Sequence, residues 1–187
     1  MRRFLPLAVV LGAAALVPVA ASGGGPDWKA LQRPLHLPTL APGGRCPASK
    51  VAPQITGKKY GVDGALGPGP VYPMLGRASL LTVFRPDGWQ VWAGQKVLWF
   101  VLPAYTGPVL IRGRRLDGSQ LMRFDDGADP PAQIRLAPGE TVKWTGQVRG
   151  SRGRPSYVRV RVPGCYGVQL DGTSFSTVVV FPVSIGR

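Results

Sequence analysis

Short runs of apolar and β-branched residues, broken by turn residues, fill the chain from residue 78 onward. The breaks read Pro-Asp-Gly, Ala-Gly-Gln, Leu-Asp-Gly and Ala-Pro-Gly-Glu, and glycine, proline and aspartate favour turns. Strands are expected at 79–84, 88–92, 96–102, 108–114, 120–124, 133–136, 140–147, 156–162, 165–170 and 174–183. About ten short strands with closely spaced turns predict an all-β protein, either a sandwich or a barrel.

The pattern inside the strands predicts which faces are buried. Residues 157–162 alternate, so their valines share one face of the strand while their tyrosine and two arginines share the other. This pattern is typical of a half-buried strand with a basic outer stripe. Residues 178–181 are apolar throughout, as in a strand that is covered on both sides, and residues 96–102 look the same after Lys96, so both runs are expected in the interior of a sheet.

The chain before the strands divides into further segments. Residues 1–21 are a predicted signal peptide, because two arginines precede an apolar run that ends in small residues. An uncleaved leader, which would be the chain's contact with a membrane, is the alternative. Residues 22–45 are rich in glycine and proline and lack a periodic apolar face, which indicates a flexible tether or an extended strap. Residues 46–187 are the predicted domain, and residues 47–76 of it are expected to be mostly loop.

Cys46 and Cys165 are the two cysteines of the chain. In an exported protein, two cysteines favour a disulfide over a metal site or a reactive thiol. Closing a loop of this length would stabilise the fold by roughly 4–5 kcal/mol if the effect is entropic. Two free, buried thiols are the alternative.

Two segments carry a resemblance to known proteins. Residues 99–117 and 162–181 resemble a group of uncharacterised secreted bacterial proteins whose domain ends in a Pro-Gly-Cys-Tyr strand followed by a phenylalanine-rich strand. Residues 163–168 are also similar to the Pro-Gly-x-Tyr-x-Val entry to the penultimate strand of bacterial immunoglobulin-like domains. The resemblance implies an immunoglobulin-like antiparallel β-sandwich and no catalytic residue. Cys46 and Cys165 are too far apart in sequence for the usual disulfide between the sheets of that fold, so the bridge is expected to join the N-terminal strap to the last hairpin.

The net charge is strongly positive, with 23 basic and 9 acidic residues and a total of +14, or +12 without Arg2 and Arg3 of the leader. A basic exported protein suits an anionic neighbour such as a wall polymer, lipid headgroups or nucleic acid. A compositional bias of the source, with arginine in excess and no asparagine, is the alternative explanation.

The densest basic cluster defines a candidate anionic-ligand face. It consists of Arg149, Arg152, Arg154, Tyr157, Arg159 and Arg161. Arginines that flank an aromatic ring could bind a nucleic-acid single strand or an anionic polysaccharide, and recognition of a specific nucleic acid is not expected. A solvated sheet face, whose charges discourage pairing with other chains, is the alternative.

Catalytic chemistry has little support in the sequence. His36 is the only histidine and lies in the predicted tether, which argues against a hydrolase that uses a histidine base. One histidine and two cysteines cannot form an ordinary zinc site, so neither a metal nor a cofactor is expected. Asp125, Asp126 and Asp129 could serve a glycosidase or bind calcium, although their setting is equally that of a polar loop.

Aromatic residues point to packing rather than to a site. Trp89, Trp92, Trp99 and Trp144 are expected in the core and not on a sugar-binding surface. The sequence as a whole therefore predicts an exported, non-enzymatic binding or structural module of the cell surface, whose partner is an anionic polymer or another surface protein. An exported hydrolase that uses the acidic loop is the alternative.

Overall fold

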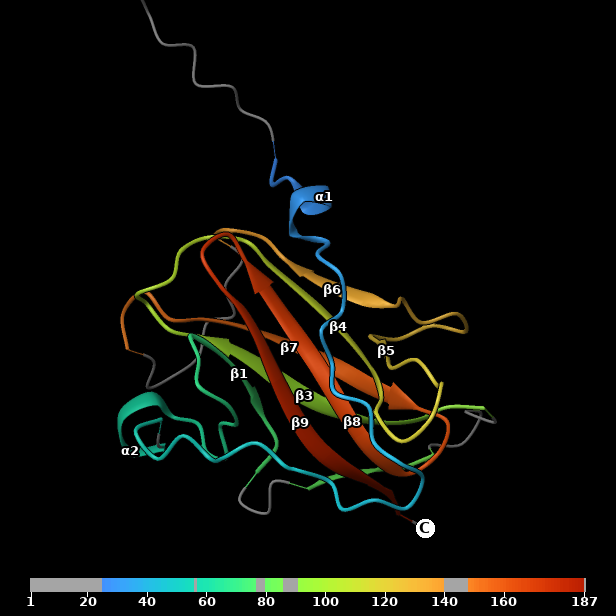
Figure 1. The fold of residues 1–187 in the computed structure, drawn as a ribbon. Coiled ribbons are helices and arrows are strands. Elements are labelled where there is room, and N and C mark those ends of the chain that lie inside the picture. The colour runs from blue at the N-terminus through green and yellow to red at the C-terminus, as the bar shows by residue number, and fades with distance from the viewer. Residues whose placement is uncertain (1–24, 56, 77–79, 86–90, 140–147, 187) are drawn as a thin grey trace, which may run out of the picture.

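The computed structural model describes residues 25–186 apart from 56, 77–79, 86–90 and 140–147, and its strands form two sheets that pack face to face (Figure 1). The sheets have the strand orders β1-β3-β7-β5 and β2-β9-β8-β4-β6. The strands are β1 (Val71–Met74), β2 (Leu81–Val83), β3 (Ala93–Val101), β4 (Val109–Arg115), β5 (Arg123–Phe124), β6 (Gln133–Leu136), β7 (Arg152–Val160), β8 (Gly164–Gly172) and β9 (Ser176–Ile185). Two one-turn helices, α1 (Trp28–Leu31) and α2 (Gly57–Tyr60), precede them. The predicted fold class, an all-β antiparallel sandwich, is confirmed.

The main core lies between the sheets and is built from alternate residues of the long strands. Trp99 of β3 and Phe124 of β5 meet edge to face, with ring centroids 6.1 Å apart. Tyr166 of β8 and Phe181 of β9 are fully buried in the same cluster. Each such ring removes about 150–250 Å² from water, so aromatic packing dominates the core. The two apolar runs predicted for the interior of a sheet lie mainly in β3 and β9, and each of these strands has a neighbouring strand on both sides, as predicted.

Six of the strands have the order of an immunoglobulin sandwich. β1-β3-β7 take the places of strands A, B and E, and β9-β8-β4 take those of G, F and C. β5 and β6 lie where D and C′ are expected, but the chain forms them in reverse order. β2 pairs with β9 in parallel, which is an exception to the antiparallel pattern. The likeness to immunoglobulin domains therefore holds for the central strands and ends at the sheet edges that β2, β5 and β6 form.

Tyr166, near the start of β8, forms the equivalent of a tyrosine corner. Its ring is fully buried, and its hydroxyl donates a hydrogen bond of 2.8 Å to the carbonyl of Val162, four residues upstream. A buried tyrosine hydroxyl requires such an acceptor. The same contact is typical of the corresponding strand in immunoglobulin folds. It explains why the Pro-Gly-Cys-Tyr sequence marks the entry to this strand.

Tyr166 also makes stability depend on alkaline pH. Burial raises the pKa of its hydroxyl from 10.0 to about 12. Because the folded-state pKa is the higher one, the stabilisation is complete below pH 10 and is lost as the pH rises through 12. We expect the free energy of unfolding, measured with urea, to fall more steeply over this range in the native protein than in Tyr166→Phe. Identical pH profiles for the two proteins would contradict a buried, neutral hydroxyl.

The segment before β1 covers part of the outer face of the four-stranded sheet. Ala52, Ile55 and Val62 form a second hydrophobic cluster with Tyr72 of β1 and Phe100 of β3. Residues 47–76 were predicted to be mostly loop, and most of them are. That prediction did not include β1 or the second hydrophobic cluster. The reason is that these apolar residues are spaced irregularly among glycines and prolines, so they have no detectable period.

Residues 26–48, called the strap below, cross the outer face of the five-stranded sheet (Figure 1). Cys46 and Cys165 form the predicted disulfide, which joins the strap to the start of β8. Leu37 of the strap is buried in a third hydrophobic cluster with Cys165 and Val180. Of the two forms predicted for this part of the chain, tether and strap, the structure has the strap.

A buried carboxylate anchors the other half of the strap. Asp171 of β8 is fully buried and accepts a hydrogen bond of 2.7 Å from Arg112 of β4. Arg112 also donates to the carbonyl of Arg33 in the strap. Beside them, the side chain of Gln169 accepts a 2.7 Å hydrogen bond from the backbone N–H of His36. The strap is therefore held by a disulfide, an apolar cluster and a polar network.

Candidate anionic-ligand site

The register of β7 separates the arginines that the sequence analysis placed on one face. β7 pairs continuously with β3, so its even-numbered side chains point into the sandwich and its odd-numbered ones point outward. Arg152 and Arg154 therefore lie on the opposite side of the sheet from Tyr157 and Arg159. The prediction of a single face is wrong for these two arginines. Arg149 precedes β7 and lies at the opposite end of the strand from Arg161, which follows it.

Arg152 and Arg154 bind groups of the protein itself. Arg152 has 5% of its surface exposed and donates to the carbonyls of Gly107 and Ala137. Arg154 forms an ion pair of 2.8 Å with Asp125. Buried guanidinium groups are stable only with such acceptors. Both arginines are therefore held by acceptors of the protein itself and do not contribute to the outer face.

Arg159 points outward as predicted, but only 3% of its surface is exposed. It donates hydrogen bonds of 3.3 and 2.8 Å to the carbonyls of Asp125 and Gly127, in the loop after β5. Burial lowers the pKa of the Arg159 guanidinium, and the charge of Asp126 opposes that shift. Arg159 thus holds the loop after β5 in place and is covered by the rest of the outer face.

Two pairs of a cation and an aromatic ring lie on the outer face of the four-stranded sheet. Lys96 of β3 lies opposite Tyr157 of β7, with its ammonium 6.0 Å from the ring centroid. Just beyond the paired residues, the guanidinium of Arg161 lies 4.5 Å from the ring centroid of Trp92. Such contacts hold a cation in place without neutralising its charge. Tyr157 and Arg161 were both predicted for this face.

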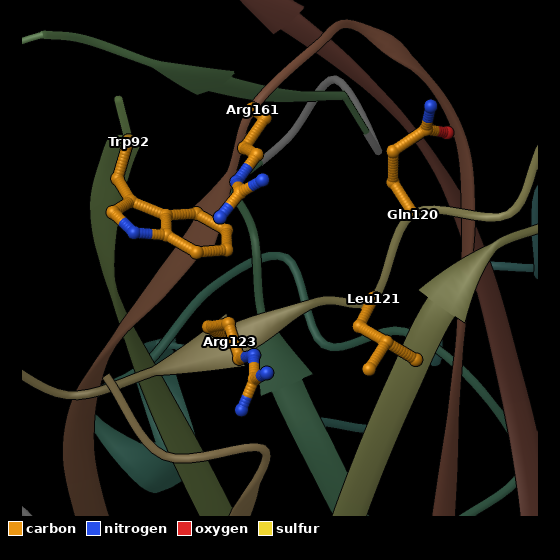
Figure 2. Close-up of a pocket in the computed structure, with 5 residues that line it drawn as sticks. All are labelled: Trp92, Gln120, Leu121, Arg123 and Arg161. Atoms are coloured by element: carbon orange, nitrogen blue, oxygen red, sulfur yellow. The ribbon is translucent and has the colours of Figure 1, made fainter. Parts of the chain in front are cut away.

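A hollow of about 170 Å³ opens beside the second pair (Figure 2). It is lined by Trp92, Gln120, Leu121, Arg123 and Arg161. In Figure 2 the Arg161 guanidinium lies over the Trp92 ring, Arg123 comes from the strand below, and Gln120 and Leu121 come from the opposite side. None of the described residues that line the hollow is acidic.

The path of the chain between β4 and β5 brings Arg123 close to Arg161. Leu121 bridges to Arg114 of the five-stranded sheet, and the chain then crosses to the four-stranded sheet as β5. Arg123 lies directly opposite Arg159 of β7. Arg161 is therefore its diagonal neighbour, at a distance of about 7–8 Å that long side chains can span.

The guanidinium groups of the hollow also have no hydrogen-bond acceptor among the described residues. Other arginines donate to backbone carbonyls or carboxylates of the protein; these are Arg33, Arg85, Arg112, Arg114, Arg115, Arg152, Arg154 and Arg159. Within the described ranges, Arg45, Arg123, Arg149 and Arg161 make no hydrogen bond or ion pair through their side chains. Of these four, Arg123 and Arg161 share one hollow, so their charges are available together.

Sequence reasoning missed Trp92, Lys96 and Arg123 as site residues. Trp99 is buried in the core as predicted, but Trp92 lies at the hollow, so the core prediction is wrong for it. Trp89 and Trp144 lie outside the described residues. A usable signal existed for two of the missed residues, because Trp92 and Lys96 alternate with the apolar residues of β3 and so had to face outward. No pattern marked Arg123, since β5 has only two residues.

The acidic loop does not form a cluster of carboxylates. Asp125 is paired with Arg154, and Asp126 and Asp129 are exposed. Within the part of the chain that the structure describes, no three His, Cys, Asp or Glu side chains form a group that could hold a metal ion. The hydrolase alternative stays a prediction, and no contact of this loop favours it.

Comparisons of the chain with protein-family models, curated proteins and solved structures give no match. The described helices include none that is both long and apolar enough to span a membrane. Function therefore has to be argued from the outer face and its hollow.

Proposed function

We propose that this protein is an exported, non-enzymatic binding module of the cell surface that holds an anionic polymer on the outer face of its four-stranded sheet. The observation that carries the proposal is the pair of guanidinium groups, Arg123 and Arg161, which share a hollow and lack acceptors among the described residues. Unneutralised charges that converge on one place attract an anion more strongly than the same charges scattered over a surface.

The rest of the uncovered face suits an extended ligand. Lys96 lies about four strand residues from Trp92, a distance of roughly 13 Å along β3. A polymer with a charge on each repeat can therefore contact the ammonium of Lys96 and the hollow together. The opposite outer face is less suitable, because the strap crosses it.

The disulfide supports an exported location. Cys46 and Cys165 are bonded, and disulfides persist in oxidising environments outside the cytosol. This chemistry agrees with export, and the basic, apolar leader predicted for residues 1–21 would provide it. Polyanions at a cell surface are then within reach of the protein.

Retention on immobilised polyanions tests the proposal. The native protein and Arg123→Ser/Arg161→Ser are applied to heparin and to a wall-polymer resin and eluted with NaCl. We expect the variant to elute at lower salt, because two contacts with the polymer are lost. The slope of log K against log [salt] should become shallower by about 1.5 for two contacts.

The double variant Arg45→Ser/Arg149→Ser is the matched control. It removes the same charge from two arginines that also lack acceptors among the described residues but lie away from the hollow. We expect its elution to stay close to that of the native protein. If both double variants lose retention equally, net charge rather than the hollow governs binding. If the native protein is not retained on either resin, the proposed function is wrong.

A further inference from the structure

We infer that the hollow takes the phosphate group of a phosphodiester-linked polyol or sugar polymer. This inference rests on the proposed function and narrows it from anionic polymers in general to one chemical class. Three observations support it: the placement of Arg123, Arg161 and Trp92, the size of the hollow, and the additional positive charge of Arg159 next to it.

The placement of the two guanidinium groups favours a tetrahedral anion. Arg123 and Arg161 come from neighbouring strands and lie on a diagonal, so they approach a common ligand from two directions. A phosphodiester has two free oxygens on a tetrahedral centre, and each can accept from a different arginine. The oxygen lone pairs of a carboxylate all lie in one plane, which a single guanidinium fork matches, so two guanidinium groups on a diagonal suit it less well.

Trp92 prepares one of these groups for binding. The guanidinium of Arg161 lies 4.5 Å from the centroid of the Trp92 ring. Stacking leaves the N–H edge of a guanidinium free to donate while restricting the motion of the side chain. Less conformational freedom is then lost when a phosphate binds. The contact with Trp92 thereby restrains Arg161, for which the described residues offer no acceptor.

The hollow is too small for a nucleobase together with its phosphate. Its volume of about 170 Å³ lies below the roughly 300–1,000 Å³ that is usual for sites that enclose a whole small molecule. One face of the Trp92 ring already carries Arg161, whereas proteins that bind single strands keep aromatic faces open for bases. Leu121, which is 47% exposed at the rim, instead offers an aliphatic contact to a polyol or a sugar ring.

The charges around the hollow also favour a bound anion. Arg123 lies directly opposite Arg159, and like charges in this arrangement destabilise a sheet. Arg161 adds a third positive charge on the same face. An anion between Arg123 and Arg161 would relieve the repulsion, so binding should stabilise the fold as well as occupy the site.

The test compares two soluble polymers of matched length and charge spacing, a polyol phosphate and a polyglutamate, by calorimetric titration of the full-length protein at fixed salt. We expect the dissociation constant for the polyol phosphate to be at least about tenfold lower, because the two arginines match a tetrahedral phosphodiester better than a planar carboxylate. Arg161→Lys keeps the charge but removes the fork, and it should abolish most of that preference. Arg149→Lys is the matched control and should leave the preference unchanged.

The outcomes separate this inference from the proposed function. Equal affinity for both polymers, lost in both cases in Arg123→Ser/Arg161→Ser, would overturn the phosphate assignment and keep the binding function. Absence of binding to either polymer would overturn both.

Two further titrations distinguish a polyol or sugar polymer from other molecules that contain phosphodiesters. The probes are phosphatidylglycerol vesicles and single-stranded oligothymidylate. Tighter binding to either than to the polyol phosphate would overturn the assignment to a polyol or sugar polymer. Arg161 is exposed and has no internal acceptor among the described residues, so its substitution is not expected to affect folding, and a thermal melt checks this.

Discussion

Replacing both cysteines by serine is expected to lower the free energy of unfolding by about 5 kcal/mol, which is the largest single effect that we predict. The bridge between Cys46 and Cys165 spans 119 residues, and long loops lose the most entropy when they are closed. Urea unfolding monitored by circular dichroism gives the magnitude. A loss below about 2 kcal/mol would contradict the loop-entropy account, in which the bridge acts by restricting the unfolded chain.

Hydrogen exchange would show where that stability resides. The backbone N–H of Leu40 in the strap donates to the carbonyl of Leu116, so its exchange reports on strap contact. In the cysteine-free variant, exchange at Leu40 should accelerate more than exchange at Val97 in the central strand β3. Equal acceleration at both positions would indicate a general loss of stability instead of local release of the strap.

Replacing Asp171 by asparagine is expected to cost about 3–5 kcal/mol, the second largest effect. The Asp171 carboxylate is fully buried and accepts hydrogen bonds from Arg112 and from Ser176, both of 2.7 Å. Its loss leaves the guanidinium of Arg112 without a counter-ion in a site with little access to water. Because Gln169 donates to Asp171 and holds the strap through the backbone N–H of His36, hydrogen exchange at His36 should be faster in the variant.

Asp117→Asn is the matched control for that prediction. Asp117 pairs with Arg115 at 2.7 Å, but the side chains of this pair are 10% and 23% exposed, and the pair does not contact the strap at Arg33. The hydrogen bond from Arg115 holds the pKa of the Asp117 carboxyl below its usual value. The control should cost about 1 kcal/mol and leave hydrogen exchange at His36 unchanged. Equal costs for the two variants would show that burial of Asp171 has no special role.

Local patterns predicted the parts of this fold that depend on neighbouring residues. Turn residues and period-two alternation located most strands, and the run Pro-Gly-Cys-Tyr marked the buried Tyr166 at the start of β8. The pairing of Cys46 with Cys165 followed from export and from the absence of other cysteines. The attachment of the strap could not be predicted, because it depends on Gln169 and Asp171, polar residues that are buried only after the sheets have formed.

The candidate site was predicted only in part, for the same physical reason. Alternation placed Tyr157 and Arg161 on the outer face correctly. It could not show that Arg152 would be buried and would donate to a backbone carbonyl. Alternation also could not show that Arg123 would lie beside Arg161 on the outer face, because that placement depends on the chain crossing between the sheets after β4. Whether a charged side chain has a partner of opposite charge depends on the tertiary structure, and the local sequence does not predict it.

The most direct test of the binding account is an NMR titration of the full-length protein with the polyol phosphate. The signals to follow are the indole N–H of Trp92 and the Nε–H groups of Arg123 and Arg161. The account predicts that these three shift together and saturate at one dissociation constant, while the signals of Arg45 and Arg149 stay unchanged. Saturating shifts at Arg45 or Arg149, with the Trp92 indole unaffected, would contradict the placement of the ligand in the hollow.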